Sequence, residues 1–280
     1  MLKNKINFTK LVASGNDFIL WDLRKKAKDT NLKNVARLLC SRKLGIGADG
    51  LLVLEKSRKA NVKMRIFNAD GSEAEMCGNG ARCVAYFISN IKTESRRQIK
   101  IDTKAGVLSA VVSRENVKIN MTDPKNIKIN STIRIKKHSL KFNFINTGVP
   151  HVVILCEGIE GIKVSSLGRL VRFHNSFKPA GTNVNFVEPV SADKIKIRTY
   201  ERGVEEETLA CGTGSVASAI IYMLKLIKSG LIKNKNIFKV NVETASSEVL
   251  KVNFEIIRNK IKNVWLEGKT RIICKGEFYV

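Results

Sequence analysis

Histidine is scarce in this chain, and the histidines and cysteines are poorly spaced for binding a metal. The 280 residues include three histidines, His138, His151 and His174, and none has the spacing to a cysteine that a zinc site requires. No CxxC pair occurs among the cysteines, which are Cys40, Cys77, Cys83, Cys156, Cys211 and Cys274. We therefore expect no metal site.

Long apolar runs are also missing. The first eight residues hold no apolar core of a secretion signal, and the longest apolar stretch, 216–227, is interrupted by Ser218 and Lys225. Disulfide frameworks belong mainly to short secreted chains. We expect a cytoplasmic protein with reduced thiols and no membrane partner.

Acidic residues are half as numerous as basic ones, 25 against 50, which leaves a net charge of +25. Such a surplus would suit a phosphate backbone. However, aromatic residues make up only 6% of the chain, and the basic residues are spread along it without forming an arm or tail. We expect no nucleic-acid partner, and a basic nucleic-acid-binding protein is kept as the non-enzyme alternative.

The hydrophobic pattern predicts many strands and few helices. Hydrophobic residues make up 44% of the chain, enough for a folded core. The expected strands are 18–22, 51–54, 62–68, 99–103, 108–112, 142–146, 152–155, 184–187, 195–200, 240–244 and 251–257. The expected helices are 32–41, 81–89 and 215–228. The polar segment 122–130 shows no strand pattern, and we expect it to be the junction between two domains.

An internal repeat supports two domains. The segment CGNGARCVA, from Cys77, resembles CGTGSVASA, from Cys211. Each copy follows a strand and an acidic turn that contains glycine, and each leads into an apolar helix. Two copies of one unit indicate two related domains rather than a solenoid.

A cysteine directly before a helix lies in the positive field of the helix N-terminus, which favours the thiolate. Neighbouring glycines let backbone N–H groups approach a carboxylate or an oxyanion. Two such thiols on opposite faces of one carbon could remove a proton from one side and deliver one to the other, which inverts the centre without a cofactor. One copy alone is weak support for catalysis, because cysteine is commonly a small buried residue. The other four cysteines are interpreted as packing residues.

Six further segments carry a resemblance. They are ASGNDF (13–18), GIGADGLL (45–52), FNADGSEAEMCGNGARC (67–83), TGVPH (147–151), GTNVNFVE (181–188) and RTYERGVEEETLACGTGS (198–215). In this order they are similar to the diaminopimelate epimerase family. The resemblance implies an α/β (α+β) fold of two pseudo-symmetric domains, each a strand-rich sheet wrapped around a central helix, with the active site in the interdomain cleft. The implied domains are 1–123 with a terminal strand 269–280, and 124–268.

The resemblance also implies a reaction. The family interconverts LL-2,6-diaminopimelate and meso-diaminopimelate without pyridoxal phosphate, any other cofactor or a metal, in lysine and peptidoglycan precursor biosynthesis. Cys77 and Cys211 would be the two acid/base thiols, with roles that swap with the direction of reaction. A homodimer is common in the family.

The substrate-binding residues are implied in the same way. The carboxylate on the reacting centre would be bound by the turn residues Gly78, Asn79, Gly212 and Thr213. The distal amino-acid group would be bound by Asn16, Asn68, Asn183, Glu201 and Arg202, with Arg202 on its carboxylate and Glu201 on an ammonium group. For His151, a role in orienting or deprotonating a thiol and a purely structural role both stay open. Gly50 and Val149 depart from members with Gln and Asn there, which leaves the distal contacts open.

Several alternatives remain. Proline, hydroxyproline and histidine racemases would keep the two thiols and change the distal residues, whereas isomerases of the phenazine type would not keep both cysteines. A redox pair formed by Cys77 and Cys211 would cycle between dithiol and disulfide. The GIGADG loop is not interpreted as a nucleotide site because it enters a strand. Asp49 and Asp70 are expected to stabilise their glycine turns.

Overall fold

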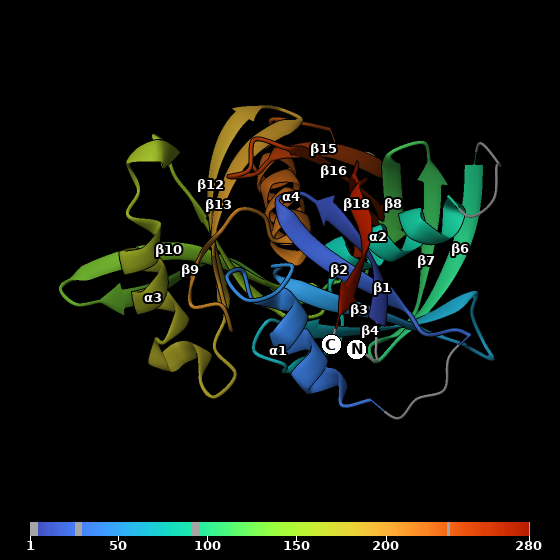
Figure 1. Cartoon of the computed structure of the whole chain (residues 1–280). Coiled ribbons are helices and arrows are strands. Elements are labelled where there is room, and N and C mark those ends of the chain that lie inside the picture. The colour runs from blue at the N-terminus through green and yellow to red at the C-terminus, as the bar shows by residue number, and fades with distance from the viewer. Residues whose placement is uncertain (1–4, 26–29, 91–95, 234–235, 280) are drawn as a thin grey trace. The chain divides into compact units, whose positions relative to one another are not determined.

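The computed structural model describes residues 5–25, 30–90, 96–233 and 236–279 (Figure 1). The chain divides into two compact units, Met1–Asn120 with Glu267–Val280, and Met121–Leu266. The predicted terminal strand 269–280 corresponds to β18, Arg271–Tyr279, and its last residue lies outside the described part of the chain.

The first unit is built of strands around one helix. Its elements are β1 (Lys5–Ala13), β2 (Asn16–Asp22), α1 (Leu32–Cys40), β3 (Gly50–Glu55), β4 (Val62–Asn68), β5 (Glu73–Ala74), α2 (Gly78–Ser89), β6 (Arg96–Thr103), β7 (Gly106–Ser113), β8 (Asn116–Asn120) and β18. Helix α2 contacts β1, β2, β4, β6, β7, β8 and β18 (Figure 1). It is therefore the central helix of this unit, whereas α1 packs one face on the sheet through Ala36, Leu39 and Cys40.

The second unit repeats this plan. Its elements are β9 (Lys125–Ile135), β10 (His138–Asn146), β11 (Pro150–Leu155), α3 (Val164–Arg172), β12 (Asn183–Ser191), β13 (Lys194–Glu201), β14 (Glu206–Thr208), α4 (Gly212–Lys228), β15 (Ile237–Glu243), β16 (Val249–Ile257) and β17 (Lys260–Lys269). The short 3-10 helices are Ile159–Gly161 and Asn175–Phe177. Helix α4 contacts β10, β11, β12, β13, β15 and β16, so it is the central helix here.

Strand pairing shows that the two units share one topology. In the first, β3 pairs in parallel with β2 and antiparallel with β4, and β4 pairs in parallel with β6. In the second, β12 pairs in parallel with β11 and antiparallel with β13, and β13 pairs in parallel with β15. The fold is thus a pseudo-symmetric α+β fold in which each unit wraps strands around a helix, as predicted.

The prediction that 122–130 contains no strand is wrong. Strand β9 begins at Lys125 and pairs antiparallel with β10. Ile127, Ile129, Ile133 and Ile135 alternate with polar residues along β9, but its first residues are mostly exposed and polar, so the pattern is weak within 122–130. Helix α3, also absent from the prediction, buries a narrow face through Val164, Gly168 and Val171.

The remaining predicted elements are confirmed, most of them with longer bounds; β4 has the predicted bounds, and α1 ends at Cys40, one residue before the predicted 41. For example, β12 extends to Ser191, four residues beyond the predicted 187, and its last three residues are exposed, so they lie outside the buried apolar run. Within the described residues, none of the helices combines the length and apolar character needed to cross a membrane.

Candidate active site

Cys77 is the residue that caps helix α2. It has extended backbone angles, φ −140° and ψ 124°, and its sulfur accepts a hydrogen bond from the Gly80 N–H at 3.5 Å. The residues that follow, Gly78 and Asn79, form the first turn of the helix. The Cys77 sulfur thus lies where N–H groups at the start of the helix stabilise negative charge.

Asn79 connects this helix start to the first residue of β2. The Asn79 Nδ2 group donates to Asn16 Oδ1, and Asn79 Oδ1 accepts from Arg82 Nη2 at 2.6 Å. Arg82 is fully buried and also donates to Ser14 Oγ at 2.9 Å. Two of the predicted substrate-binding residues, Asn16 and Asn79, are therefore brought into direct contact.

Asn68 lies at the end of β4, in an exposed turn. Its Nδ2 donates to Ser72 Oγ at 2.9 Å, and Ser72 Oγ in turn donates to Asp70 Oδ1 at 2.6 Å. Asp70 also accepts from the Ser72 N–H, and these hydrogen bonds hold the pKa of Asp70 below its ordinary value. Asp70 thus stabilises the turn before Cys77, as expected.

Cys211 occupies the matching position in the second unit, as the N-cap residue of α4. Its side chain is nearly buried, with 6% exposed, and its sulfur lies 3.5 Å from the Thr213 hydroxyl. The carbonyl of Thr213 accepts a hydrogen bond from Thr147 Oγ1 at 3.1 Å. This contact anchors the first turn of α4, which begins with Gly212, to the loop before β11.

The remaining predicted residues of the second unit lie near the end of β13. Asn183 Oδ1 accepts from the Arg202 N–H at 2.8 Å, and Asn183 Nδ2 donates to the Pro150 carbonyl at 3.1 Å. Arg202 Nη1 donates to the Ala180 carbonyl at 3.0 Å, and Glu201 Oε2 accepts from Thr208 Oγ1 at 3.0 Å. Asn183 therefore ties the Arg202 backbone to the start of β11.

His151 is fully buried on β11, next to Asn183 in the β11–β12 register. Asn185 Nδ2 donates to the Val152 carbonyl at 2.9 Å, which fixes the orientation of the amide, and it also approaches His151 Nδ1 at 3.1 Å. Nδ1 must then be an acceptor, so the ring hydrogen is on Nε2. Burial, assisted by the positive charge of Arg202, lowers the pKa of His151 to about 3. The ring is therefore neutral, and Nε2 has no hydrogen-bond partner among the described residues.

A bidentate Arg–Glu pair links the two strands that lead to each cysteine. Arg65 Nε donates to Glu73 at 2.7 Å and Nη2 at 3.1 Å, and Arg198 Nε and Nη2 donate to Glu207 at 2.7 and 2.8 Å. Glu73 and Glu207 each stand four residues before the cysteine of their unit. Because the two pairs are equivalent, they show which residues of the first unit correspond to which residues of the second.

The same correspondence reveals a difference beneath the two cysteine helices. Strand pairing matches Leu52 and Ile66 of the first unit with Asn185 and Thr199 of the second. The apolar contact of the first unit is replaced in the second by a hydrogen bond from Thr199 Oγ1 to Asn185 Oδ1 at 3.0 Å. By the same alignment, His151 occupies the position of Phe18. The residues beneath the start of α4, next to Cys211, are therefore polar (Asn185 and Thr199), whereas those beneath the start of α2, next to Cys77, are apolar (Leu52 and Ile66).

Three of the four cysteines predicted to pack do so. Cys83 is fully buried in α2 with a strongly raised pKa, and burial raises the pKa of Cys40 to about 12. Cys156 is half-buried and packs against the core of the second unit. The prediction is wrong for Cys274, which is exposed on β18. A strand context alone did not show which face of β18 this side chain occupies.

Sequence reasoning missed Asn185 and Arg82. Asn185 follows Asn183 by two residues in an apolar strand, and this alternation places both on one face of the sheet. Arg82 is the one charged residue of the otherwise apolar and small-residue segment 81–89. Each was visible as a polar residue at a position that the pattern predicts to be buried.

Solved structures share this fold. A phenazine biosynthesis protein of the PhzF family from Bacillus anthracis superposes with a TM-score of 0.77 at 15% identity, covering 99% of this chain and 100% of that one. A hydroxyproline epimerase from Agrobacterium vitis gives a TM-score of 0.70 at 14% identity, covering 99% and 93%. The protein therefore shares the fold of these two structures, one of which is an epimerase.

Sequence comparison is more specific. The family model described as diaminopimelate epimerase matches residues 8–127 and 143–264. The diaminopimelate epimerase of Aquifex aeolicus is 42% identical over 282 residues, covering 97% of each chain, and that of Hydrogenobaculum sp. is 39% identical over 281 residues, covering 96% of each. The chain belongs to the diaminopimelate epimerase family, whose members are isomerases.

Proposed function

We propose that this protein interconverts LL-2,6-diaminopimelate and meso-diaminopimelate by a two-base reaction of Cys77 and Cys211. One thiolate removes the α-proton and becomes a thiol, while the second thiol donates its proton to the opposite face and becomes a thiolate. The observation that carries the proposal is that both cysteines are N-cap residues of the central helices, at matching positions of the repeat. The names of the relatives supply the substrate.

The substrate carboxylate at the reacting carbon would be bound by the first turns of α2 and α4. The N–H groups of Gly78, Asn79, Gly212 and Thr213 belong to these turns, where backbone donors have no partner within the helix. Such donors stabilise the charge that develops on the carboxylate when the α-proton leaves. The Thr213 hydroxyl is also placed to hydrogen-bond the Cys211 sulfur.

The distal amino-acid group would be bound by Asn16, Asn68, Asn183, Glu201 and Arg202. Arg202 supplies a planar fork for a carboxylate, and Glu201 supplies a negative charge for an ammonium group. Asn183 would act through its hydrogen bond to the Arg202 backbone. His151 would serve as a neutral hydrogen-bond donor through Nε2, since its Nδ1 is already an acceptor.

We also propose that the two units are the epimerase domains 1–123 with 269–280, and 124–268. The reaction needs reduced thiols, which supports a cytoplasmic location. We further propose that the protein forms a homodimer and has no nucleic-acid or membrane partner. Sedimentation of the pure protein and binding to a non-specific duplex at physiological salt test these two points.

Incubation with LL-diaminopimelate in deuterated water tests the reaction. We expect meso product with deuterium at the α-carbon and no need for an added cofactor. Cys77→Ala and Cys211→Ala should each lose at least about 100-fold in rate, because each removes one proton-transfer group. Cys83→Ala, in the same helix as Cys77 but buried, should keep most of the activity. Full activity of Cys211→Ala, or turnover of proline or histidine in place of diaminopimelate, would contradict the proposal.

A further inference from the structure

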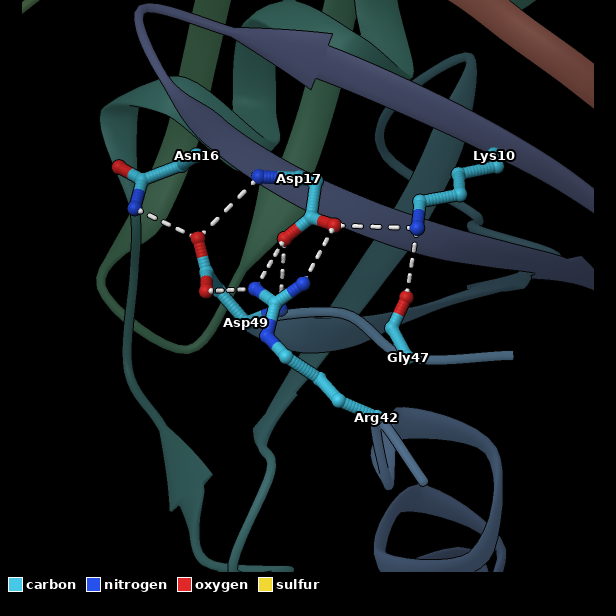
Figure 2. A network of polar contacts seen from close by, with 6 residues as sticks. All are labelled: Lys10, Asn16, Asp17, Arg42, Gly47 and Asp49. Atoms are coloured by element: carbon cyan, nitrogen blue, oxygen red, sulfur yellow. Dashed lines mark hydrogen bonds and ion pairs between the residues drawn. The ribbon is translucent and has the colours of Figure 1, made fainter. Parts of the chain in front are cut away.

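A chain of polar side chains runs from the surface of the first unit to the start of α2. Figure 2 shows its outer part, in which Asp49 is held by Asn16, Asp17 and Arg42. Asp49 Oδ2 accepts from Asn16 Nδ2 at 3.1 Å and from the Asp17 N–H at 3.2 Å, and Asp49 Oδ1 accepts from Arg42 Nη2 at 2.7 Å. In each of these three hydrogen bonds the Asp49 carboxylate is the acceptor.

The charges around Asp49 are balanced. Arg42 Nη2 also donates to Asp17 Oδ1 at 2.9 Å, and Lys10 Nζ lies 3.1 Å from Asp17 Oδ2 (Figure 2). Burial opposes ionisation of Asp17, but the hydrogen bonds from Arg42 and Lys10 outweigh it and hold the pKa of Asp17 below its ordinary value. Lys10 is anchored in turn to the Gly47 carbonyl at 2.7 Å. Arg42 therefore bridges the two carboxylates, and Lys10 pairs with Asp17.

The inner end of the chain is fixed by Arg82, which donates hydrogen bonds where Asp49 accepts them. The Arg82 guanidinium can only donate, and it donates to Asn79 Oδ1, so the Asn79 amide nitrogen must point the other way. That nitrogen donates to Asn16 Oδ1. The acceptor-only carboxylate of Asp49 independently requires the Asn16 nitrogen on its own side. Both ends thus impose the same orientation on the two amides.

We infer that Asp49 is a positioning residue for substrate binding: together with Arg82, it fixes the side-chain amides of Asn16 and Asn79 in one orientation. In that orientation Asn16 Nδ2 has one hydrogen on Asp49 and a second that a substrate oxygen can accept. This inference rests on the proposed function, in which Asn16 binds the distal end of the substrate. It gives the GIGADG loop a purpose beyond its own turn.

The substitution Asp49→Asn tests this role while keeping the shape of the side chain. A neutral amide can donate as well as accept, so it no longer dictates which end of Asn16 faces it. We expect KM for LL-diaminopimelate to rise roughly 3- to 10-fold, the effect of one net hydrogen bond. The value of kcat should stay within about twofold, because Asn79 is proposed to bind the reacting end of the substrate through its backbone N–H and not through its side-chain amide.

Asp22→Asn is the matched control. Asp22 lies at the other end of β2 and also pairs with an arginine, since Arg24 Nε and Nη2 donate to it at 2.8 and 2.6 Å. The same chemical change there should leave KM unchanged. Thermal unfolding of both variants reports any structural loss, and equal KM increases in both would overturn the inference.

A second readout does not depend on activity. The side-chain amide signals of Asn16 and Asn79 in a ¹⁵N-labelled protein can be assigned by their loss in Asn16→Ser and Asn79→Ser. Asp49→Asn should shift both sets and speed their exchange with water, whereas Asp22→Asn should not. If Asp49→Asn left these signals unchanged, the inference would be overturned, even with an active wild-type epimerase. If the wild type did not turn over LL-diaminopimelate, the proposed function would fail. The amide signals would still decide whether Asp49 orients Asn16 and Asn79.

Discussion

Asn185 donates an amide hydrogen to His151 Nδ1 across 3.1 Å inside the second unit, and this contact fixes the tautomer of a fully buried ring. The same amide is held by the Val152 carbonyl and by the Thr199 hydroxyl, so it cannot turn over without losing both hydrogen bonds. His151 is therefore a donor at Nε2 and has no lone pair available to take a proton from a thiol.

Nitrogen-15 NMR of the histidine rings tests this tautomer. We expect the His151 Nε2 signal to be that of a protonated nitrogen and the Nδ1 signal that of an unprotonated one. Both should stay unchanged from about pH 5 to about pH 8, because the pKa of His151 is lowered to about 3. A ring that is protonated at Nδ1, or that titrates in this range, would contradict the assignment and restore the base role.

The substitution His151→Phe should flatten the dependence of stability on pH. Between the ordinary pKa of 6.5 and the folded value of about 3, the unfolded chain binds a proton that the folded chain does not. Folding stability contributed by the neutral ring is thus complete above about pH 6.5 and falls as the pH drops toward 3. Phenylalanine occupies the equivalent position 18 and cannot titrate.

Urea unfolding at several pH values between about 7.5 and 4 measures this slope. The His151→Phe variant should lose less stability on acidification than the wild type, whatever its stability at neutral pH. His138→Gln, an exposed position, controls for the removal of a histidine. Parallel slopes in the wild type and in His151→Phe would show that the ring is protonated before the protein unfolds.

The Arg65–Glu73 pair predicts a second acid-dependent effect. The hydrogen bond from Arg65, followed by the contact with Lys104, lowers the pKa of Glu73 from 4.5 to about 2. A lowered pKa contributes stability that is present above about pH 4.5 and is lost as the pH falls toward 2. Glu73→Gln should therefore destabilise the protein at neutral pH by no more than about 3 kcal/mol, and less where solvent screens the pair.

The difference between Glu73→Gln and the wild type should close as the pH falls from about 4.5 to about 2, when the native carboxylate is itself protonated. Chemical unfolding across this range measures it. Glu277→Gln is the control, because Glu277 pairs with Lys5 on the surface, and such pairs contribute little. A destabilisation by Glu73→Gln that stayed constant down to pH 2 would mean that packing, and not charge, stabilises this hairpin.

The repeat and the central helices could be predicted from the sequence, but their first turns could not. The apolar pattern predicts helices from residues 81 and 215, whereas α2 and α4 begin three residues earlier, at Gly78 and Gly212. Glycine has a low helix propensity, and here tertiary packing outweighs it. The motif nevertheless predicts the location of each cysteine before its helix, because glycine spacing and the apolar run agree.

The hydrogen bonds around the site could not be predicted, since they join residues far apart in the chain. Arg82 reaches Ser14, and Asn16 reaches both Asp49 and Asn79, through strand order that local patterns do not encode. A polar residue within an apolar run signals a buried partner without identifying it. Strand β9 was missed for a different reason: Ile127, Ile129, Ile133 and Ile135 alternate along it, but the exposed lysines and asparagines of its first half obscure this pattern.

Alanine substitutions at Gly214 and Gly80 should distinguish the polar contact beneath the start of α4 from the apolar contact beneath the start of α2. A Cβ atom on Gly214 would lie 2.3 Å from Asn185 Oδ1, whereas one on Gly80 would lie 2.9 Å from Leu52 Cδ2. The end of a leucine side chain can move aside, but Asn185 is held by three hydrogen bonds. We expect Gly214→Ala to cost about 3 kcal/mol of unfolding free energy and Gly80→Ala about 1 kcal/mol.

Urea unfolding of both variants measures these costs, with Gly161→Ala as the control because a Cβ atom on Gly161 would meet open space within the described part of the chain. Gly214→Ala should also change the histidine ring signals of His151, since displacing Asn185 removes the donor to Nδ1. Gly80→Ala should leave them unchanged. If Gly214→Ala were as stable as Gly80→Ala and the ring signals stayed in place, the added Cβ atom would be accommodated without displacing Asn185, and the hydrogen bonds of Asn185 would not fix the start of α4.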